Sequence, residues 1–296
     1  MKSVTVVKRR VNLLVLLIMV VIGFFWILPL IWVGLNSFRT NHEFLQAYTV
    51  FSGPWDYLKN IVPWEWTLIS YKQLFTGEGV NGSVDMLRMI LNSLIVSVSS
   101  TVIVLVITTL SAFAYERLHF PNGEKIFWTL FLLNLFPNTV SIIPQYKICY
   151  AIGWLNNLNA LIWPCVTGVM NILLLRNFMK SIPKELDEAA RIDGASSFAV
   201  YIRVIVPCMK PVLMVVGLFA FKHAWNDYLW PSIVMTGSKN LTLTAGLRNL
   251  HMQLEANYWA TLQAATILSI LFPFVLYLVA QNYFLRGISI TAAVKG

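Results

Sequence analysis

A polar stretch between two long apolar runs holds most of the groups that could do chemistry in this chain. Residues 181–195 read Ser-Ile-Pro-Lys-Glu-Leu-Asp-Glu-Ala-Ala-Arg-Ile-Asp-Gly-Ala. A carboxylate such as Glu188 can form a charge-assisted hydrogen bond with an arginine of a partner protein. The small neighbours Ala189 and Ala190 would let the partner surface come close. The pattern therefore predicts a docking surface for a soluble protein, and its alternative is a solvated loop with no partner.

A second polar cluster interrupts an apolar run nearer the C-terminus. Its members are Lys222, His223, Trp225, Asn226 and Asp227. A lysine at the centre of a membrane-spanning helix costs roughly 2.5–3.5 kcal/mol on insertion scales, so Lys222 should face the bundle interior or a water-filled path. Lys222 and Asn226 are four residues apart, as are His223 and Asp227, and each pair can share one helix face. The cluster is either a self-satisfied structural network or part of a path for cargo.

The sequence lacks the common motifs of catalysis and cofactor binding. It has no GxxxxGKS or GxxxxGKT phosphate loop, no GxSxG and no HExxH. The cysteines Cys149, Cys165 and Cys208 are scattered, and no histidine lies at metal-ligand spacing from them. We therefore expect no enzymatic activity, no bound cofactor and no metal site. An intramembrane enzyme, which needs several polar groups converging in the membrane, and a secondary carrier, which inverted repeats would favour, stay as alternatives.

Composition indicates that membrane-spanning helices position these groups. Hydrophobic residues make up 57% of the 296-residue chain and charged residues 12%, whereas soluble domains carry roughly 25% charged residues. The mean hydropathy is +0.68. A chain of this length has room for about six spans of ~20–25 residues. The net charge of +9 fits the basic residues of cytoplasmic loops better than nucleic-acid binding, because no compact basic and aromatic module is present.

We predict an all-α integral membrane protein with six transmembrane helices, in which the polar stretch lies between the fourth and the fifth. The expected spans are residues 11–35, 86–114, 126–143 (interrupted by Pro137 and Pro144), 158–175, 211–235 and 257–283. The uncharged run 11–35 exceeds a signal-peptide core, so we expect a retained anchor. The predicted segments are the N-terminus with the first helix (1–36), an external Trp-rich segment (37–85), a transmembrane core (86–283) with the polar loop 176–210, and a tail (284–296).

Lysines and arginines indicate the orientation. If both termini are cytoplasmic, basic residues are about twice as frequent in the inside loops as in the outside loops, as the positive-inside rule expects. The polar loop 176–210 and the tail 284–296 are then cytoplasmic. Within the loop, Ala and Glu favour a helix before Gly194, which can take a positive φ and end that helix in a tight turn. Ser196 and Ser197 can cap a following helix that begins near Phe198.

The spacing within this loop resembles the EAA loop of ABC-importer permeases. Glu188-Ala189-Ala190 is followed by three residues, Gly194, nine residues, and then Val204, Val206 and Pro207 where that loop has Ile-x-Leu-Pro. Residues 176–195, the segment Ala224-Trp-Asn-Asp-Tyr-Leu and the terminal Ala292-Ala-Val-Lys-Gly resemble the carbohydrate-importer branch, in particular permeases of the maltose-transporter MalG type. The resemblance runs from about residue 86 to the end, and residues 37–85 match much less.

This resemblance implies a subunit of an ATP-driven saccharide importer in the bacterial cytoplasmic membrane. Its expected partners are a second, non-identical permease, two ATP-binding subunits that hold ATP and Mg, and an extracytoplasmic solute-binding protein. The implied ATPase-coupling residues are Glu188, Ala189, Ala190, Asp193, Gly194 and Pro207. The implied tail contacts with the ATPases are Ala293, Val294, Lys295 and Gly296.

The resemblance also sharpens the question about the second polar cluster. Trp225, Asn226 and Asp227 fit the family pattern and can be structural there. Lys222 and His223 depart from the small or apolar residues that the family pattern has at these positions. One reason for the departure is an acidic cargo, such as a uronate oligosaccharide.

Overall fold

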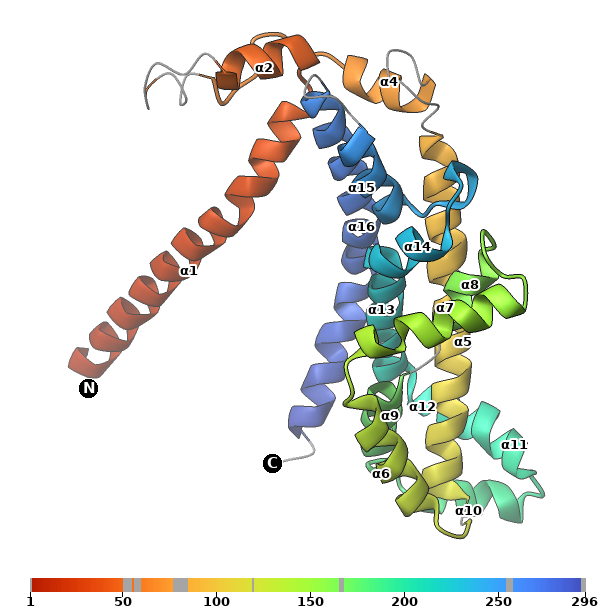
Figure 1. Cartoon of the computed structure of the whole chain (residues 1–296). Coiled ribbons are helices and arrows are strands. Elements are labelled where there is room, and N and C mark those ends of the chain that lie inside the picture. Colours follow the sequence, from red (N-terminus) through yellow and green to blue (C-terminus); the bar gives the residue numbers. More distant parts are fainter. Residues whose placement is uncertain are drawn as a thin grey trace. The chain divides into compact units, whose positions relative to one another are not determined.

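The computed structural model describes residues 2–49, 55, 60–76, 85–118, 120–164, 168–253 and 258–293, and every regular element within them is helical (Figure 1). The predicted all-α class is therefore confirmed for these residues. The chain divides into two compact units. One comprises Met1–Asp85 with Asn249–Ile270, and the other comprises Met86–Arg248 with Leu271–Gly296.

The first unit begins with a long apolar helix, α1 (Lys2–Asn36). Its portion Val15–Asn36 contains an 18-residue window with a mean hydropathy of 2.8 and no buried residue, which is the composition of a membrane span and overlaps the predicted first span. Two shorter helices follow, α2 (Asn41–Thr49) and α4 (Ile69–Thr76). Sequence analysis placed an external Trp-rich segment here and did not predict these helices.

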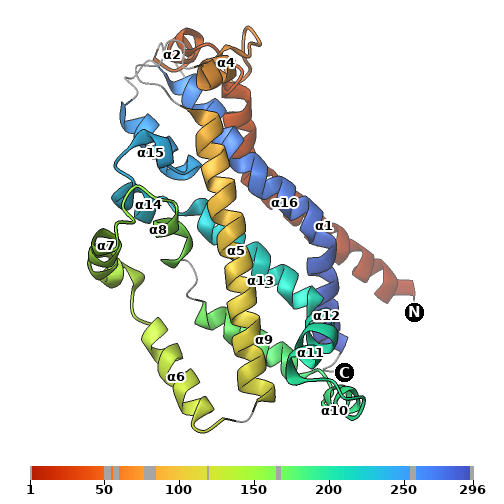
Figure 2. The same cartoon turned by 90° about the vertical axis from the view of Figure 1, so that its right-hand side faces the viewer.

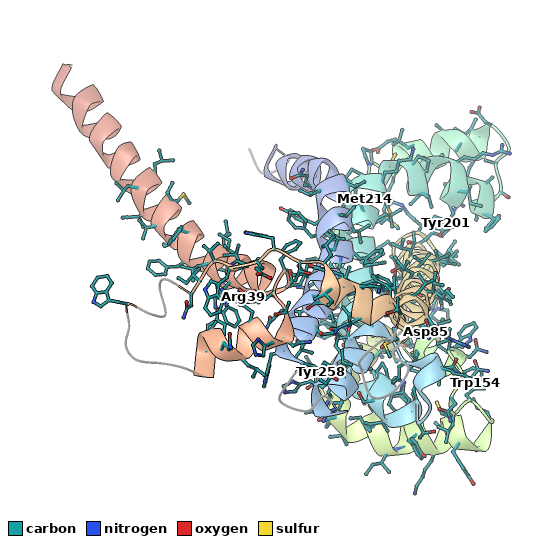
Figure 3. The ribbon with its side chains drawn as sticks, turned by 90° about the horizontal axis from the view of Figure 1, so that it is seen from above. Arg39, Asp85, Trp154, Tyr201, Met214 and Tyr258 are labelled. Carbon is teal, nitrogen blue, oxygen red and sulfur yellow. The ribbon has the colours of Figure 1, made fainter. Side chains whose placement is uncertain are left out.

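A buried arginine organises the segment after α1. Arg39 has no exposed surface and lies among the side chains at the α1–α2 corner (Figure 3). Its Nε is 3.6 Å from Glu43 Oε1, and its guanidinium also donates to the Asn60 carbonyl. Glu43 Oε1 in turn accepts a hydrogen bond of 2.7 Å from the Trp64 backbone N–H. These contacts hold residues 60–64 against α2, so the segment is an ordered structure and not a loose loop.

The second unit is built around α5 (Met86–Arg117), α9 (Val169–Lys180) and α13 (Lys210–Asn226). The buried face of α5 is lined largely by small side chains, among them Ser97, Ser100 and Ala112. Small residues allow helix backbones to approach closely, and a Cβ added to Gly217 of α13 would lie 3.5 Å from Leu105 of α5. The density of small residues in α5 therefore serves helix packing.

Shorter helices complete this unit, and two views show their order along the chain (Figures 1 and 2). They are α6 (Gly123–Asn134), η1 (Asn138–Ser141), α7 (Ile142–Ala151), α8 (Asn159–Ile162), α10 (Glu185–Ile192), α11 (Ser197–Val200), η3 (Tyr201–Ile205), α12 (Val206–Cys208), α14 (Leu229–Val234) and η4 (Ser238–Asn240). Helix α15 (Leu243–Gln253) belongs to this unit as far as Arg248 and to the first unit from Asn249. The last helix, α16 (Trp259–Ala293), also contributes residues to both units.

The number of continuous spans is lower than predicted in the described part of the chain. Three helical stretches there are long and apolar enough to cross a membrane: Val15–Asn36, Met86–Arg117 and Trp259–Val279. Two further stretches qualify only as bent pairs, Gly123–Asn134 with Asn138–Ala151 (88°) and Ser197–Cys208 with Lys210–Val234 (81°). Proline explains the first bend, because Pro137 lacks an N–H and disfavours helix at the residue before it.

The predicted fourth span, 158–175, is not one continuous helix. Helix α8 ends at Ile162, and α9 begins at Val169 after Gly168. Pro164 and Gly168 are poor helix formers inside a span, and residues 165–167 lie outside the described part of the chain. The predicted fifth span, 211–235, is likewise divided into α13 and α14 by the extended residue Asp227.

Candidate functional site

The polar loop forms the helix, turn and helix that its sequence predicts. Helix α10 carries Glu185, Asp187 and Glu188 in its first turn, where negative charge favours the helix dipole. Gly194 has φ +82°. The N–H of Ala195 donates to the Ala190 carbonyl (2.9 Å) and that of Gly194 to the Arg191 carbonyl (3.0 Å). This is a Schellman turn, which needs a left-handed residue at the glycine position.

The second helix of the loop is capped as expected. Ser196 Oγ accepts a hydrogen bond of 3.3 Å from the Ala199 N–H, so Ser196 is the N-cap of α11, which begins at Ser197. The π-helical segment η3 and α12 follow, and Pro207 lies exposed in α12. Tyr201, labelled in Figure 3, and Ile205 are buried in a core shared with Phe113 and Leu175. That core fixes the loop to α5 and α9.

The outward face of the loop is exposed and partly apolar. Glu188, Ala189 and Asp193 are exposed, and Ala190 is half-buried. Ile192 is 86% exposed and Phe198 is 64% exposed, although the surrounding residues are polar. Exposed carboxylates beside large exposed apolar side chains are the composition of a docking surface.

The inward face of α10 carries an ion pair that sequence analysis missed. Asp187 is buried, and its Oδ2 lies 2.6 Å from Nε of Arg117, the last residue of α5. Arg117 Nη2 also donates to the Ile182 carbonyl at 2.8 Å and to the Met179 carbonyl at 3.3 Å. Its neighbour Glu116 pairs with Arg176 of α9 at 2.6 Å. The sequence did contain a signal for a charged contact here, because the adjacent charges Glu116 and Arg117 end a long apolar run.

The second polar cluster lies where α13 ends. A cavity of about 450 Å³ is lined by Phe219, Lys222, His223, Asn226, Asp227, Tyr228 and Leu229. Helix α13 stops at Asn226, and Asp227 turns to extended backbone. Asp227 Oδ1 accepts a hydrogen bond of 3.4 Å from the Trp230 N–H at the start of α14. No ion pair involves Lys222 within the described part of the chain.

Trp225, the remaining member of the predicted cluster, does not line this cavity. Its side chain is 1% exposed and stacks on Phe221, with ring centroids 5.6 Å apart and an interplanar angle of 17°. It also contacts the Phe272 ring at 5.2 Å. Trp225 is thus a packing residue that holds the end of α13, while Lys222, His223, Asn226 and Asp227 face the cavity.

A further cation lies beside the cavity. The Arg248 guanidinium of α15 sits over the Tyr228 ring at 5.6 Å from its centroid, a cation–π contact, and Tyr228 lines the cavity. Among the described residues, no group of three or more His, Cys, Asp or Glu side chains could hold a metal ion. The predicted tail contacts cannot be placed, because Ala293 is the last described residue and Val294, Lys295 and Gly296 lie outside the described part.

Comparison with known protein families identifies a transport component. The profile of the family described as binding-protein-dependent transport system inner membrane component matches residues 74–290. A relative from Shigella flexneri serotype 5b (strain 8401), the sn-glycerol-3-phosphate transport system permease protein UgpE, is 33% identical over 213 residues, which cover 72% of this chain and 75% of the relative. The UgpE protein of Pectobacterium atrosepticum is 26% identical over 272 residues, covering 92% and 94%.

Two solved structures share the fold. One is a bacterial ABC transporter involved in the import of the acidic polysaccharide alginate, with a TM-score of 0.77, 19% identity, and coverage of 93% of this chain and 97% of that chain. The other is a bacterial alginate ABC transporter in complex with an alginate pentasaccharide-bound periplasmic protein, with a TM-score of 0.63, 17% identity, and coverage of 93% and 94%.

Proposed function

Because this chain belongs to the family of inner membrane components of binding-protein-dependent transport systems, we propose that it forms half of the translocation path of an ATP-driven importer for a saccharide or oligosaccharide. A member of this family is a transport permease subunit and not an enzyme. A secondary carrier or an intramembrane enzyme would not require the binding-protein-dependent machinery that defines the family, so membership of the family argues against both.

The proposed assembly contains a second, non-identical permease, two ATP-binding subunits that hold ATP and Mg, and an extracytoplasmic solute-binding protein. Support for the last partner is that one structure of the same fold was solved with a periplasmic protein bound. We propose that both termini are cytoplasmic, in keeping with the distribution of basic residues. Six spans result if the bent pairs α6–α7 and α11–α14 and the segment from α8 to α9 each cross once.

The loop containing α10 is the proposed coupling segment to the ATPase. Glu188, Ala189, Asp193 and Gly194 are exposed on it, and Ala190 lies half-buried beside them. The ordered Schellman turn and the Ser196 cap hold this surface in one conformation before any partner binds, which lowers the entropic cost of docking. We propose that the tail residues 293–296 add a second contact with the ATP-binding subunits.

We propose further that the cargo is an anionic saccharide, and the observation that carries this is Lys222 in the cavity at the end of α13. An ammonium group attracts a carboxylate more strongly in a low-dielectric path than in bulk water. His223 and Asn226 add further hydrogen-bonding groups, and Asp227 has one oxygen engaged by the Trp230 N–H. The names of the relatives point the same way, since they concern sn-glycerol-3-phosphate and the acidic polysaccharide alginate.

The test compares uptake of neutral and uronate-containing oligosaccharides by the complete complex in proteoliposomes. We expect Lys222→Met, which roughly keeps the side-chain volume, to lower uptake of the acidic cargo by about tenfold or more, since a hydrogen bond to a charged group contributes about 1.5–3 kcal/mol. Lys147→Met, at an exposed lysine of α7 away from the cavity, should change nothing. A wild-type complex that moves only neutral sugars, or a Lys222→Met complex that moves acidic ones equally well, would refute the anionic cargo.

A further inference from the structure

Two adjacent residues of opposite charge at one end of α5 form ion pairs with different helices. This end is cytoplasmic in the orientation proposed above. Glu116 accepts from Arg176 of α9, and the Arg176 guanidinium also lies 4.2 Å from the centre of the Phe127 ring of α6. Arg117 reaches the other way, to Asp187 of α10. Both views place α10 near this end of α5 (Figures 1 and 2). The end of α5 is therefore fastened to α6, α9 and α10 at once.

The contact with α10 is as short and as buried as the contact with α9. The side chains of Arg117 and Asp187 are only 5% and 10% exposed, with Nε and Oδ2 2.6 Å apart. Arg117 also donates to the carbonyls of Met179 and Ile182, in the connection between α9 and α10. The planar guanidinium can donate to both carbonyls through Nη2 while its Nε edge stays in ion-pair contact with Asp187, because its nitrogens form a rigid fork. If α10 moved and Arg117 did not, the buried charges of Arg117 and Asp187 would lose each other as partners, which is energetically costly. A displacement of α10 should therefore move Arg117 as well.

Helix α5 is built to carry such a displacement. It runs for 32 residues from Met86 to Arg117 without a glycine or a proline, whereas one bent pair of this unit breaks at Pro137 and the other between Pro207 and Pro211. At 1.5 Å per residue it is about 48 Å long. At its opposite end Asn92 Nδ2 donates to the Lys239 and Leu241 carbonyls, at 3.1 and 3.0 Å, and Ser93 Oγ accepts from the Leu243 N–H at 2.7 Å.

We propose that the Arg117–Asp187 pair is the link through which movement of α10 is passed to α5, and through α5 to the packed helix α13 that bears the cargo cavity. Arg117 and Asp187 are positioning residues in this scheme, since neither meets cargo or nucleotide. The proposal rests on the proposed function, because it takes α10 to be the segment moved by the ATPase. In this scheme the ATPase acts on the outward face of α10, which carries Glu188. The inward face, which carries Asp187, passes the movement to Arg117 of α5.

The experiment uses the complete complex and separates docking from transmission. Three quantities are measured for each variant: the amount of ATP-binding subunits retained on the purified complex, ATP hydrolysis, and the cargo moved per ATP hydrolysed. For Asp187→Asn and Arg117→Gln we expect normal retention, with cargo per ATP lowered roughly 2- to 30-fold, the range typical of mutations that weaken coupling. A purely structural role would lower the yield of complex and leave the ratio unchanged.

Two further variants make the outcome decisive. Lys180→Gln is the control, because Lys180 is 58% exposed and only 3.9 Å from Glu116, and such exposed pairs contribute little. Arg117→Lys keeps the charge and loses the fork, so it should lower the ratio less than Arg117→Gln does. If either neutral variant cannot be recovered, Arg117→Lys decides by itself: a reduced ratio supports the link, and a normal ratio overturns it.

Failure of this inference is distinguishable from failure of the proposed coupling role of α10. Loss of retained ATP-binding subunits in Asp187→Asn would make Asp187 a docking residue and overturn the link. Normal cargo per ATP in both neutral variants would overturn it as well. Neither result bears on the proposed coupling role of α10, which is tested by Glu188→Lys: a complex unaffected by that change would remove α10 from the ATPase interface, whatever Arg117 does.

Discussion

The turn at Gly194 offers a test of the coupling segment in which the size of the perturbation follows from the structure. Gly194 has φ +82°, and a Cβ added there would meet no heavy atom within 4 Å. Gly194→Val therefore introduces backbone strain without a steric clash. The left-handed conformation costs an L-residue about 1–2 kcal/mol, and a β-branched residue is a pronounced outlier there. The native turn should then lose roughly 5- to 30-fold in population relative to alternatives, by the relation of 1.4 kcal/mol to tenfold.

The chain contains a matched control for this change. Gly153 follows α7 with φ +71°, is exposed like Gly194, and also has nothing within 4 Å of an added Cβ. It closes the same kind of Schellman turn, because the Trp154 N–H donates to the Cys149 carbonyl (2.8 Å) and the Gly153 N–H to the Tyr150 carbonyl (3.1 Å). Gly153→Val imposes the same strain outside the proposed coupling segment.

The assay is the apparent affinity of purified ATP-binding subunits for the membrane subunits in nanodiscs, followed by uptake in proteoliposomes. We expect Gly194→Val to weaken that affinity by roughly 5- to 30-fold, because the docking conformation is populated less. Gly153→Val should leave the affinity unchanged, while it lowers the thermal stability of the complex by about as much as Gly194→Val does. Equal affinities for the two variants, or a loss in both, would refute the reasoning that the Gly194 turn presents the docking surface.

Three other expectations follow from described contacts. Glu188→Lys reverses an exposed charge on α10 and should leave insertion intact while abolishing cargo-stimulated ATP hydrolysis; unchanged hydrolysis and uptake would contradict it. A cysteine placed at Ser196, in a background without the native cysteines, should react with a membrane-impermeant thiol reagent only from the cytoplasmic side, and labelling of intact cells from outside would overturn the orientation. Arg39→Met leaves the buried Glu43 without its cationic partner, so it should destabilise the packing of residues 37–49 against 60–76 by about 3–5 kcal/mol, seen as faster proteolysis there and restored by adding Glu43→Leu.

The features that sequence analysis predicted well depend on neighbours in the chain. The turn at Gly194 and the cap at Ser196 are decided by residues within five positions, so residue type and spacing suffice. The apolar runs at α1, α5 and the start of α16 are long and uninterrupted, and they form helices at the predicted places. The prediction of the fourth span as a continuous helix was wrong. It relied on the high hydropathy of residues 158–175 and gave too little weight to Pro164 and Gly168, which disfavour a helix between α8 and α9.

The features that sequence analysis missed join residues far apart in the chain. Arg117 and Asp187 are 70 positions apart, and Arg176 and Glu116 are 60 apart. A charge at a helix end can be read from sequence, but its partner depends on which helices become neighbours, and local pattern does not carry that information. For Arg39 the same reason covers only the contact with the Asn60 carbonyl, 21 residues away, because Glu43 lies four residues away and the pair could have been read from spacing.

Trp225 is an intermediate case, because helical geometry alone could have separated it from its neighbours. At about 100° per residue, Lys222, Asn226 and His223 occupy an arc of roughly 100°, while Trp225 lies some 60° to the other side of Lys222. The structure places that side in the core, against Phe221 and Phe272. Because sequence analysis grouped all five residues of the cluster by polarity, it overlooked that the helical spacing puts Trp225 on a different face from Lys222, His223 and Asn226.

If α13 crosses the bilayer as we propose, the free-energy cost of placing Lys222 in the membrane indicates what its cavity contains. A lysine in a span costs roughly 2.5–3.5 kcal/mol. Lys222 lies one turn before the end of α13, where the helix dipole favours a cation by about 0.3–1 kcal/mol. The remainder has to come from water or an anion in the cavity, because no carboxylate in the described part of the chain pairs with Lys222. Removing the charge relieves that cost, so a loss of acidic-cargo uptake in Lys222→Met could not be attributed to a less stable helix.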